Sequence, residues 1–130
     1  MKAYLSYWIG GWKQKPDNFV LNCHKISSFL AKKHFNEIHF LTDSKSLEYF
    51  KEFKFDSVEC IFDDLDVRYN NVWSVSKLLA YDHICDKGDP FIHIDYDVFL
   101  WAGIQQRLKN AQVFAQCHEH HSYYWYEIEK

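Results

Sequence analysis

The sequence predicts an α/β fold: a single three-layer domain with a mainly parallel sheet between two layers of helices. Short apolar segments rich in aromatic and β-branched residues alternate with segments in which apolar residues recur at helical spacing. Parallel strands need crossover connections, and a helix in each crossover covers a face of the sheet. The 130 residues fit one domain of ordinary size, and no repeat, low-complexity tract or linker divides residues 1–130.

The first strand and the first helix are predicted near the N-terminus. Lys2 to Trp8 alternates loosely and is rich in Tyr, Leu and Trp, which favours a strand. Gly10 and Gly11 end this strand, and Asp17 is a good N-cap for a helix that runs to about His34. We expect the buried face of this helix to carry Phe19, Cys23, Ile26 and Leu30.

A second strand, a short helix and a third strand are predicted next. Glu37 to Leu41 favours a strand, which ends at Thr42–Asp43. Asp43 or Ser44 is expected to cap a short helix, and Ser57 to Phe62 favours a third, shorter strand. The apolar residues of the short helix are Leu47, Phe50 and Phe53.

The following part of the chain predicts one long helix and a strand that ends in carboxylates. Asn71 is expected to cap a helix from about Val72 to Cys85, and Gly88 is a natural stop for it. Phe91 to Ile94 favours a fourth strand, which runs directly into Asp95-Tyr96-Asp97. The pattern is completed by a short helix around Ile104–Leu108 and a strand over Ala111–Cys117.

Composition and charge exclude several classes of protein. The net charge is -3 with His counted as neutral, and no basic cluster forms the electrostatic footprint of a nucleic-acid-binding protein. The longest apolar stretches have the length of strands, far below the roughly 20 residues that a membrane span needs. The N-terminus lacks the apolar region and the cleavage site of a signal peptide. We therefore expect a soluble cytoplasmic protein.

The four cysteines are expected to be buried, reduced thiols. No two of them form a C-x-x-C pair, and each lies inside an apolar segment. This pattern favours buried thiols over disulfides or a zinc site. The residues are Cys23, Cys60, Cys85 and Cys117.

The strongest local signal for function is the run Asp95-Tyr96-Asp97 after the fourth strand. Ligands of open α/β sheets bind at the carboxyl ends of the strands, where both carboxylates would lie. Two neighbouring carboxylates repel unless a cation lies near them, and Mg²⁺ or Mn²⁺ prefers oxygen ligands completed by phosphates. The run fits either a divalent cation that holds a diphosphate or an ordinary acidic turn, and the spacing alone does not separate the two.

The region from Trp73 to Trp101 resembles the metal-binding region of glycosyltransferases with the GT-A fold. In such families a helix with a basic residue is followed by a turn and by an apolar strand that ends in D-x-D. Here the helix carries Lys77, and the strand ends in Asp95-Tyr96-Asp97. Tyr4 to Trp8 and Phe40 to Asp43 look like the first and second strands of these enzymes. The order of elements matches over nearly the whole chain, while only the D-x-D region is specific at residue level.

The resemblance implies roles for five of the candidate site residues. Asp97 would bind Mn²⁺ or Mg²⁺ directly, and Asp95 would bind the metal or the ribose. Lys77 stands where related families usually carry Arg, so it would bring charge to the diphosphate or the donor sugar without a bidentate fork. Tyr7 and Trp8 would stack on the base. The alternatives from the residues alone are a solvated helix position for Lys77 and core packing for the two rings.

The resemblance also implies a substrate class. Asp43, at the end of the second strand, would contact the nucleotide donor. The implied function is a metal-dependent glycosyltransferase of the hexosyltransferase type. It would move a sugar from a nucleotide-diphosphate donor, with a UDP-sugar expected, to a glycan or polysaccharide acceptor.

The length of the chain keeps other functions open. Such enzymes are usually longer, because a second half holds the acceptor site and often a late His that completes the metal shell. We expect that half to be missing here, with His118–His121 either a substitute ligand or an exposed tail. The alternative is a non-catalytic α/β module that binds a nucleotide sugar or a partner protein. A haloacid dehalogenase-type phosphatase is less favoured, because Val98-Phe99 follows the D-x-D run. The aromatic tail Tyr123–Tyr126 predicts self-association into a homo-oligomer.

Overall fold

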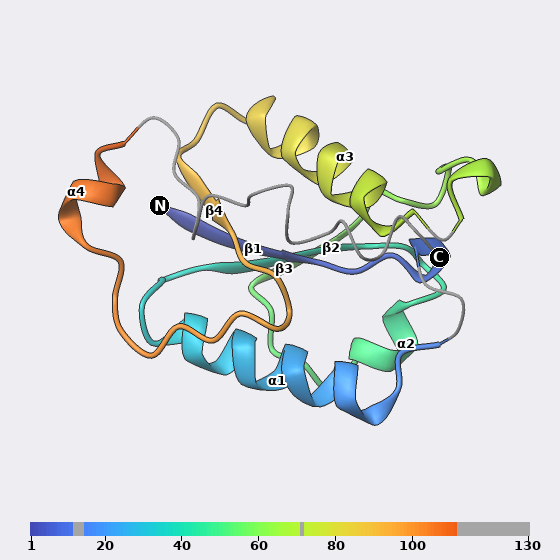
Figure 1. Cartoon of the computed structure of the whole chain (residues 1–130), viewed down its shortest axis with the longest axis horizontal. Coiled ribbons are helices and arrows are strands. Elements are labelled where there is room, and N and C mark those ends of the chain that lie inside the picture. The colour runs from blue at the N-terminus through green and yellow to red at the C-terminus, as the bar shows by residue number, and fades with distance from the viewer. Residues whose placement is uncertain (12–14, 71, 112–130) are drawn as a thin grey trace, which may run out of the picture.

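The computed structural model describes residues 1–11, 15–70 and 72–111, and these residues form an α/β fold around a parallel sheet (Figure 1). The sheet has four strands in the order β3-β2-β1-β4, and every neighbouring pair is parallel. The predicted parallel sheet is therefore confirmed. The strands are β1 (Lys2–Ser6), β2 (Ile38–Thr42), β3 (Ser57–Cys60) and β4 (Phe91–His93).

Helices cover both faces of this sheet (Figure 1), as the alternation of strands and helices predicts. One face carries α1 (Asn18–Lys32) and α2 (Leu47–Phe50), and α3 (Trp73–Cys85) crosses the other. The short helix α4 (Gln106–Lys109) lies beyond the sheet and begins two residues later than predicted. Two 3-10 turns, η1 (Ile9–Gly11) and η2 (Val67–Tyr69), lie in the loops.

Local sequence signals fix the ends of several helices. The Asp17 carboxylate accepts a hydrogen bond of 2.8 Å from the backbone N–H of Val20, which confirms Asp17 as the N-cap of α1. Gly88 follows α3 with a φ of 73°, a conformation that glycine adopts without steric cost, so its role as the helix stop is also confirmed. The predicted cap Asn71 lies outside the described residues.

The start of α2 differs from the prediction. The helix begins at Leu47 after Ser46, and neither Asp43 nor Ser44 caps it directly. Asp43 instead accepts a hydrogen bond from the backbone N–H of Ser46, which closes the turn before the helix. The carboxylate therefore stabilises the turn before α2 and not the first turn of the helix, and α2 ends at Phe50, before the predicted Phe53.

The alternation of side chains along β1 divides the apolar interior into two cores. Ala3, Leu5 and Tyr7 pack toward α1, and Tyr4 and Trp8 pack toward α3. Because every second side chain faces the same side, Ser6 lies on the α3 face with Tyr4 and Trp8. This alternation decides which residue of β1 can reach the candidate site at the carboxyl end of the strand.

The predicted buried face of α1 is wrong by part of a turn. Cys23 and Leu30 are buried, but Phe19 is 69% exposed and Ile26 is 45% exposed. The segment after β4 crosses α1 (Figure 1), and the Ser27 hydroxyl donates a hydrogen bond of 2.8 Å to the carbonyl of Val98. Close passage of that segment requires small and polar side chains, so packing rather than hydropathy selects the face. Its buried residues are Cys23, His24, Ser27, Leu30 and Ala31.

The prediction of buried thiols is correct for one of the three described cysteines. Cys23 is buried in α1, whereas Cys60 and Cys85 are exposed, and all three are free thiols. Cys60 ends the edge strand β3, and Cys85 is the last residue of α3, so both lie where the covering layers stop. Cys117 lies outside the described residues.

The C-terminal predictions fall mostly outside the described residues. The predicted strand over Ala111–Cys117 lies outside the described residues from its second position on. The His118–His121 tail and the aromatic run Tyr123–Tyr126 lie wholly outside them. Among the described residues, none of the helices has the length and apolar character needed to cross a membrane.

His24 is a buried polar residue in the core between the sheet and α1. Its side chain is 0% exposed, stacks on Tyr96 with ring centroids 5.1 Å apart, and also contacts Tyr7 and Phe50. Neither ring nitrogen has a hydrogen-bond partner among the described residues. Burial lowers the pKa of His24 to about 3, so the imidazole is neutral at physiological pH.

We expect this histidine to make the fold sensitive to acid. Because its folded pKa lies below the unfolded value of about 6.5, its contribution is fully present above that pH and is lost as the pH falls toward 3. This single group lowers the free energy of unfolding by at most about 1.4 kcal/mol for each pH unit of acidification. The free energy of unfolding, measured with urea at pH 7 and at pH 5, should fall less between the two pH values in His24→Phe than in wild type. The control at a half-buried histidine, His83→Gln, should lose stability as wild type does, and an equal loss in all three proteins would contradict the assignment.

Candidate functional site

Most of the residues predicted to bind a donor meet at the carboxyl edge of β1 and β4. They line a shallow cavity of about 190 Å³, which we call the Lys77 cavity. Its walls come from the end of β1, the first turns of α3 and the run after β4, so segments far apart in sequence converge there. The lining residues are Ser6, Tyr7, Trp8, Trp73, Ser76, Lys77, Asp95, Tyr96 and Asp97.

Asp95 is the centre of a polar cluster in this cavity. The Lys77 ammonium lies 2.5 Å from Asp95 Oδ2, and His93 Nδ1 lies 3.6 Å from Asp95 Oδ1. The other ring nitrogen of His93 is hydrogen-bonded to the Ser6 hydroxyl at 2.9 Å. Burial lowers the pKa of His93 to about 4, with Lys77 lowering it further and Asp95 opposing the shift.

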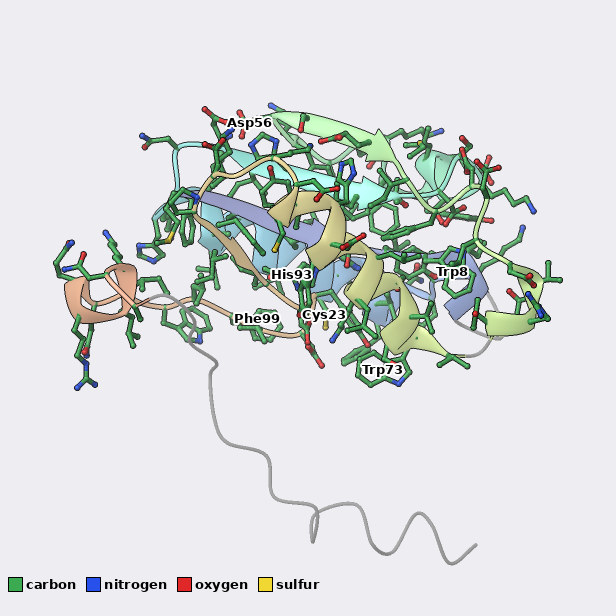
Figure 2. All side chains as sticks on the ribbon, turned by 90° about the horizontal axis from the view of Figure 1, so that it is seen from above. Trp8, Cys23, Asp56, Trp73, His93 and Phe99 are labelled. Atoms are coloured by element: carbon green, nitrogen blue, oxygen red, sulfur yellow. The ribbon has the colours of Figure 1, made fainter. Side chains whose placement is uncertain are left out.

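Lys77 is also held by an aromatic ring. Trp73 is the first residue of α3 (Figure 2), one helical turn before Lys77, and the ammonium lies 4.3 Å from a Trp73 ring centroid. This is a cation–π contact combined with an ion pair, so the ammonium is fixed from two sides. Lys77 is therefore turned into the cavity and is not a freely solvated helix residue.

Asp97 differs from Asp95 in its surroundings. Its side chain is exposed and makes no hydrogen bond or ion pair with residues 1–11, 15–70 or 72–111. Tyr96, between the two carboxylates, packs on His24, and burial followed by the charge of Asp97 raises the pKa of Tyr96. Anchoring of Tyr96 in the α1 core leaves Asp95 and Asp97 at the cavity wall.

These carboxylates fit a hard divalent cation only in part. Mg²⁺ and similar ions are commonly held by one or two carboxylates, with waters and substrate phosphates completing the shell. Asp97 and Asp95 supply such a pair, and within the described part of the chain no group of three or more His, Cys, Asp or Glu side chains could enclose a metal. The donor set therefore suits a cation that arrives with a phosphate ligand.

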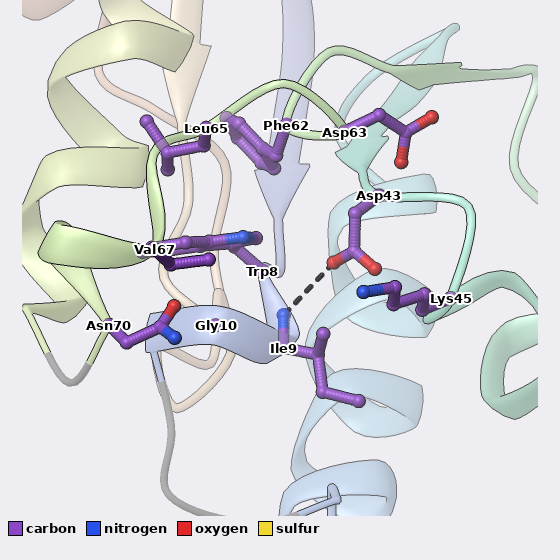
Figure 3. Close-up of a pocket in the computed structure, with 10 residues that line it drawn as sticks. All are labelled: Trp8, Ile9, Gly10, Asp43, Lys45, Phe62, Asp63, Leu65, Val67 and Asn70. Carbon is purple, nitrogen blue, oxygen red and sulfur yellow. Dashed lines mark hydrogen bonds between the residues drawn. The ribbon is translucent and has the colours of Figure 1, made fainter.

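A second, larger cavity adjoins the first. It has a volume of about 390 Å³ (Figure 3). We call it the Trp8 cavity, because Trp8 lines this cavity as well as the first. Its polar groups come from Asp43, Lys45, Asp63 and Asn70. Its apolar wall is formed by Trp8, Ile9, Phe62, Leu65 and Val67.

Asp43 has a structural role that its position in the sequence did not reveal. One carboxylate oxygen accepts hydrogen bonds from the backbone N–H of Ile9 at 2.9 Å and the hydroxyl of Ser46 at 2.7 Å (Figure 3 draws the first). The other oxygen accepts from the backbone N–H of Ser46 at 3.0 Å. With the side chain 3% exposed, Asp43 joins the end of β2 to the end of β1 and shapes the cavity.

The two aromatic residues predicted to stack on a base are both buried. Tyr7 is 3% exposed and packs against His24 and Phe50. Trp8 is 5% exposed, and a Cβ at Gly10 would lie only 2.3 Å from its ring, so that ring lies directly against the Gly10 backbone. The structure thus places both residues beside the cavities, but neither ring has an open face on which a base could stack.

Comparison with known proteins gives a family for the chain. Residues 2–130 match a family model described as a family of unknown function, DUF6734. The chain belongs to this family. No curated protein and no solved structure matches the chain.

In this member of DUF6734, the site also contains residues that the sequence analysis did not assign to function. Ser6 and His93 lie on adjacent strands and face the Lys77 cavity side of the sheet, and Trp73 holds the Lys77 ammonium. For Ser6, the sequence signal was the alternation of side chains along the strand, which places it on the same face as Tyr4 and Trp8. The four-residue spacing of Trp73 and Lys77 was the signal for that pair.

Proposed function

We propose that the chain is a metal-dependent glycosyltransferase of the hexosyltransferase type, which moves a sugar from a nucleotide-diphosphate donor to a glycan or polysaccharide acceptor. The observation that carries the proposal is the convergence of Lys77, Asp95 and Asp97 at the carboxyl edge of a parallel sheet. The adjoining Trp8 cavity supports it, because two neighbouring cavities that share Trp8 as a wall residue suit the diphosphate and the nucleoside of one ligand. The resemblance of the D-x-D region to GT-A enzymes points to the same chemistry.

In this proposal the Lys77 cavity holds the diphosphate. The ammonium of Lys77 supplies positive charge as a point donor, and Asp97 together with Asp95 would hold Mn²⁺ or Mg²⁺. When bound, the cation neutralises the charge that develops on the departing diphosphate. The chain's own residues then orient the phosphates relative to the sheet edge.

The Trp8 cavity holds the nucleoside. Its volume of about 390 Å³ lies within the range of small-molecule sites. The amide of Asn70 offers a donor and an acceptor, as recognition of a base such as uracil requires, and Lys45 and Asp63 can bind hydroxyls of the ribose. Trp8 contributes its edge, and we assign no stacking role to Tyr7 because His24 and Phe50 enclose its ring.

A second candidate function is binding of the nucleotide sugar without transfer. Lys77, Asp95 and Asp97 are all assigned to the diphosphate and its cation, and these contacts hold a donor whether or not an acceptor is activated. In this second candidate function, the two cavities bind the same nucleotide sugar, but no sugar is transferred.

The test is a titration of the purified chain with UDP, in Mn²⁺ and in chelator, followed by a screen of UDP-sugars by mass spectrometry. We expect UDP to bind at least about tenfold more tightly with Mn²⁺, because each ligand strengthens the other. Consumption of one UDP-sugar supports the transferase, while binding without consumption supports the second candidate. Absence of UDP binding in both conditions would overturn the proposal.

A further inference from the structure

In the proposed function, the Lys77 ammonium and a divalent cation both require the Asp95 carboxylate, and the following inference rests on that function. The Lys77 ammonium occupies Asp95 Oδ2 at 2.5 Å, and His93 Nδ1 faces the other oxygen at 3.6 Å. Asp97, two residues along, makes no hydrogen bond or ion pair with the described residues. The two carboxylates that would share a divalent cation are therefore unequally available.

We propose that Lys77 is the resident cation of Asp95 in the unliganded protein and that the phosphates of a ligand draw it away, which opens Asp95 to the divalent cation. An ammonium and a divalent cation cannot both lie beside one carboxylate without strong repulsion. A phosphate anion removes this conflict, because it offers Lys77 a second partner in the same cavity. Lys77 thus makes cation binding conditional on phosphate binding.

The surroundings of Lys77 suit such an exchange. Its side chain is about one quarter exposed, and the Asp95 side chain about one third, so neither partner has to leave a dry interior. The Trp73 ring lies 4.3 Å from the ammonium and provides a surface that Lys77 can keep contacting as it moves. The four-carbon stem of lysine allows the movement without a change in α3.

The expected consequence is weak binding of free Mn²⁺ by wild type and strong coupling between Mn²⁺ and phosphate ligands. Lys77→Met removes the ammonium and keeps an apolar side chain of similar length. Asp95 and Asp97 are then two neighbouring carboxylates without a resident cation, which favours Mn²⁺. We expect Lys77→Met to bind free Mn²⁺ about tenfold more tightly than wild type and to show a smaller gain in Mn²⁺ affinity on addition of inorganic pyrophosphate.

The experiment measures free Mn²⁺ by electron paramagnetic resonance during titration of wild type, Lys77→Met and Lys77→Gln, each with and without pyrophosphate. The matched control is Lys87→Met, which removes the same charge from a 2.6 Å ion pair with Glu59 at the other end of α3. Circular dichroism checks that each variant is folded, and Lys77→Gln tests the same prediction with a polar side chain. A gain in both Lys77 variants and none in Lys87→Met supports the exchange.

Two outcomes separate this inference from the proposed function. If both Lys77 variants bind free Mn²⁺ no more tightly than wild type, the exchange is overturned, even where wild type binds UDP with Mn²⁺. If the variants gain Mn²⁺ affinity and lose coupling to pyrophosphate while wild type binds no UDP, the exchange stands and the nucleotide-sugar proposal fails. If Lys87→Met gains the same affinity for free Mn²⁺, the gain comes from the change in net charge alone, and the exchange is overturned.

Discussion

Replacement of Asp97 by Asn is expected to lower the affinity for UDP in the presence of Mn²⁺ by at least about tenfold, because even the loss of a residue that only orients a metal ligand costs about 10- to 100-fold in metal affinity. Asp97 is the carboxylate without a partner among the described residues, so its charge is available to a hard cation. The amide keeps the shape of the side chain and removes the charge. Affinity in chelator should change little, because no metal is then shared. Calorimetric titration of both proteins, with Mn²⁺ and with chelator, measures all four affinities.

The fold of this variant should survive, because Asp97 is exposed and relief of repulsion with Asp95 favours the unliganded protein. Asp86→Asn, an equal loss of charge at an exposed position just after α3, serves as the control and should retain UDP affinity. Equal UDP affinity of wild type and Asp97→Asn in both conditions would leave the acidic turn as the better interpretation of Asp95-Tyr96-Asp97.

Replacement of Asp43 by Ala is expected to give the largest loss of stability among the charged residues predicted for the site, about 3 kcal/mol. The substitution leaves three donors without their acceptor: the backbone N–H of Ile9 and both the N–H and the hydroxyl of Ser46. Asp43 is almost completely buried, so water cannot easily replace the three hydrogen bonds that its carboxylate accepts. Urea unfolding of wild type and variant gives the difference directly.

The matched control for this prediction is Asp63→Ala. Asp63 also accepts from a backbone N–H and a hydroxyl, both of Ser44, but it is exposed, so water can satisfy the freed donors. We expect a small effect there, and Asp43→Asn should lie between wild type and Asp43→Ala because its amide oxygen can still accept. If Asp43→Ala is as stable as Asp63→Ala while UDP binding is lost, Asp43 acts as a ligand residue rather than as a structural anchor.

The local signals of the sequence were sufficient for the order and type of most elements. Alternating apolar segments gave four strands within a few residues of their observed ends, although β1 stops at Ser6 and not at Trp8. Asp17 and Gly88 act where predicted because a helix cap depends on neighbouring backbone groups alone. The parallel arrangement followed from the alternation of strands and helices, which requires crossovers.

Side-chain surroundings could not be derived in the same way. The buried face of α1 depends on the segment after β4, which passes close to Ser27 from more than 60 residues along the chain. Cys60 and Cys85 are exposed because β3 is an edge strand and α3 ends at Cys85, and hydropathy around a cysteine does not report either fact. The aromatic residues Tyr7 and Trp8 line the site, but their packing partners leave neither ring face open.

By itself, the sequence determined that Asp95 and Asp97 follow a strand of a parallel sheet at its carboxyl end, the edge at which open α/β folds bind their ligands. Only the tertiary structure decided that these two carboxylates differ, with Asp95 paired to Lys77 and Asp97 exposed. It also decided that Asp43 anchors the ends of two strands. The physical reason is that strand order and helix caps arise from neighbouring residues and their period, whereas the partner of a charge depends on which distant segment packs beside it.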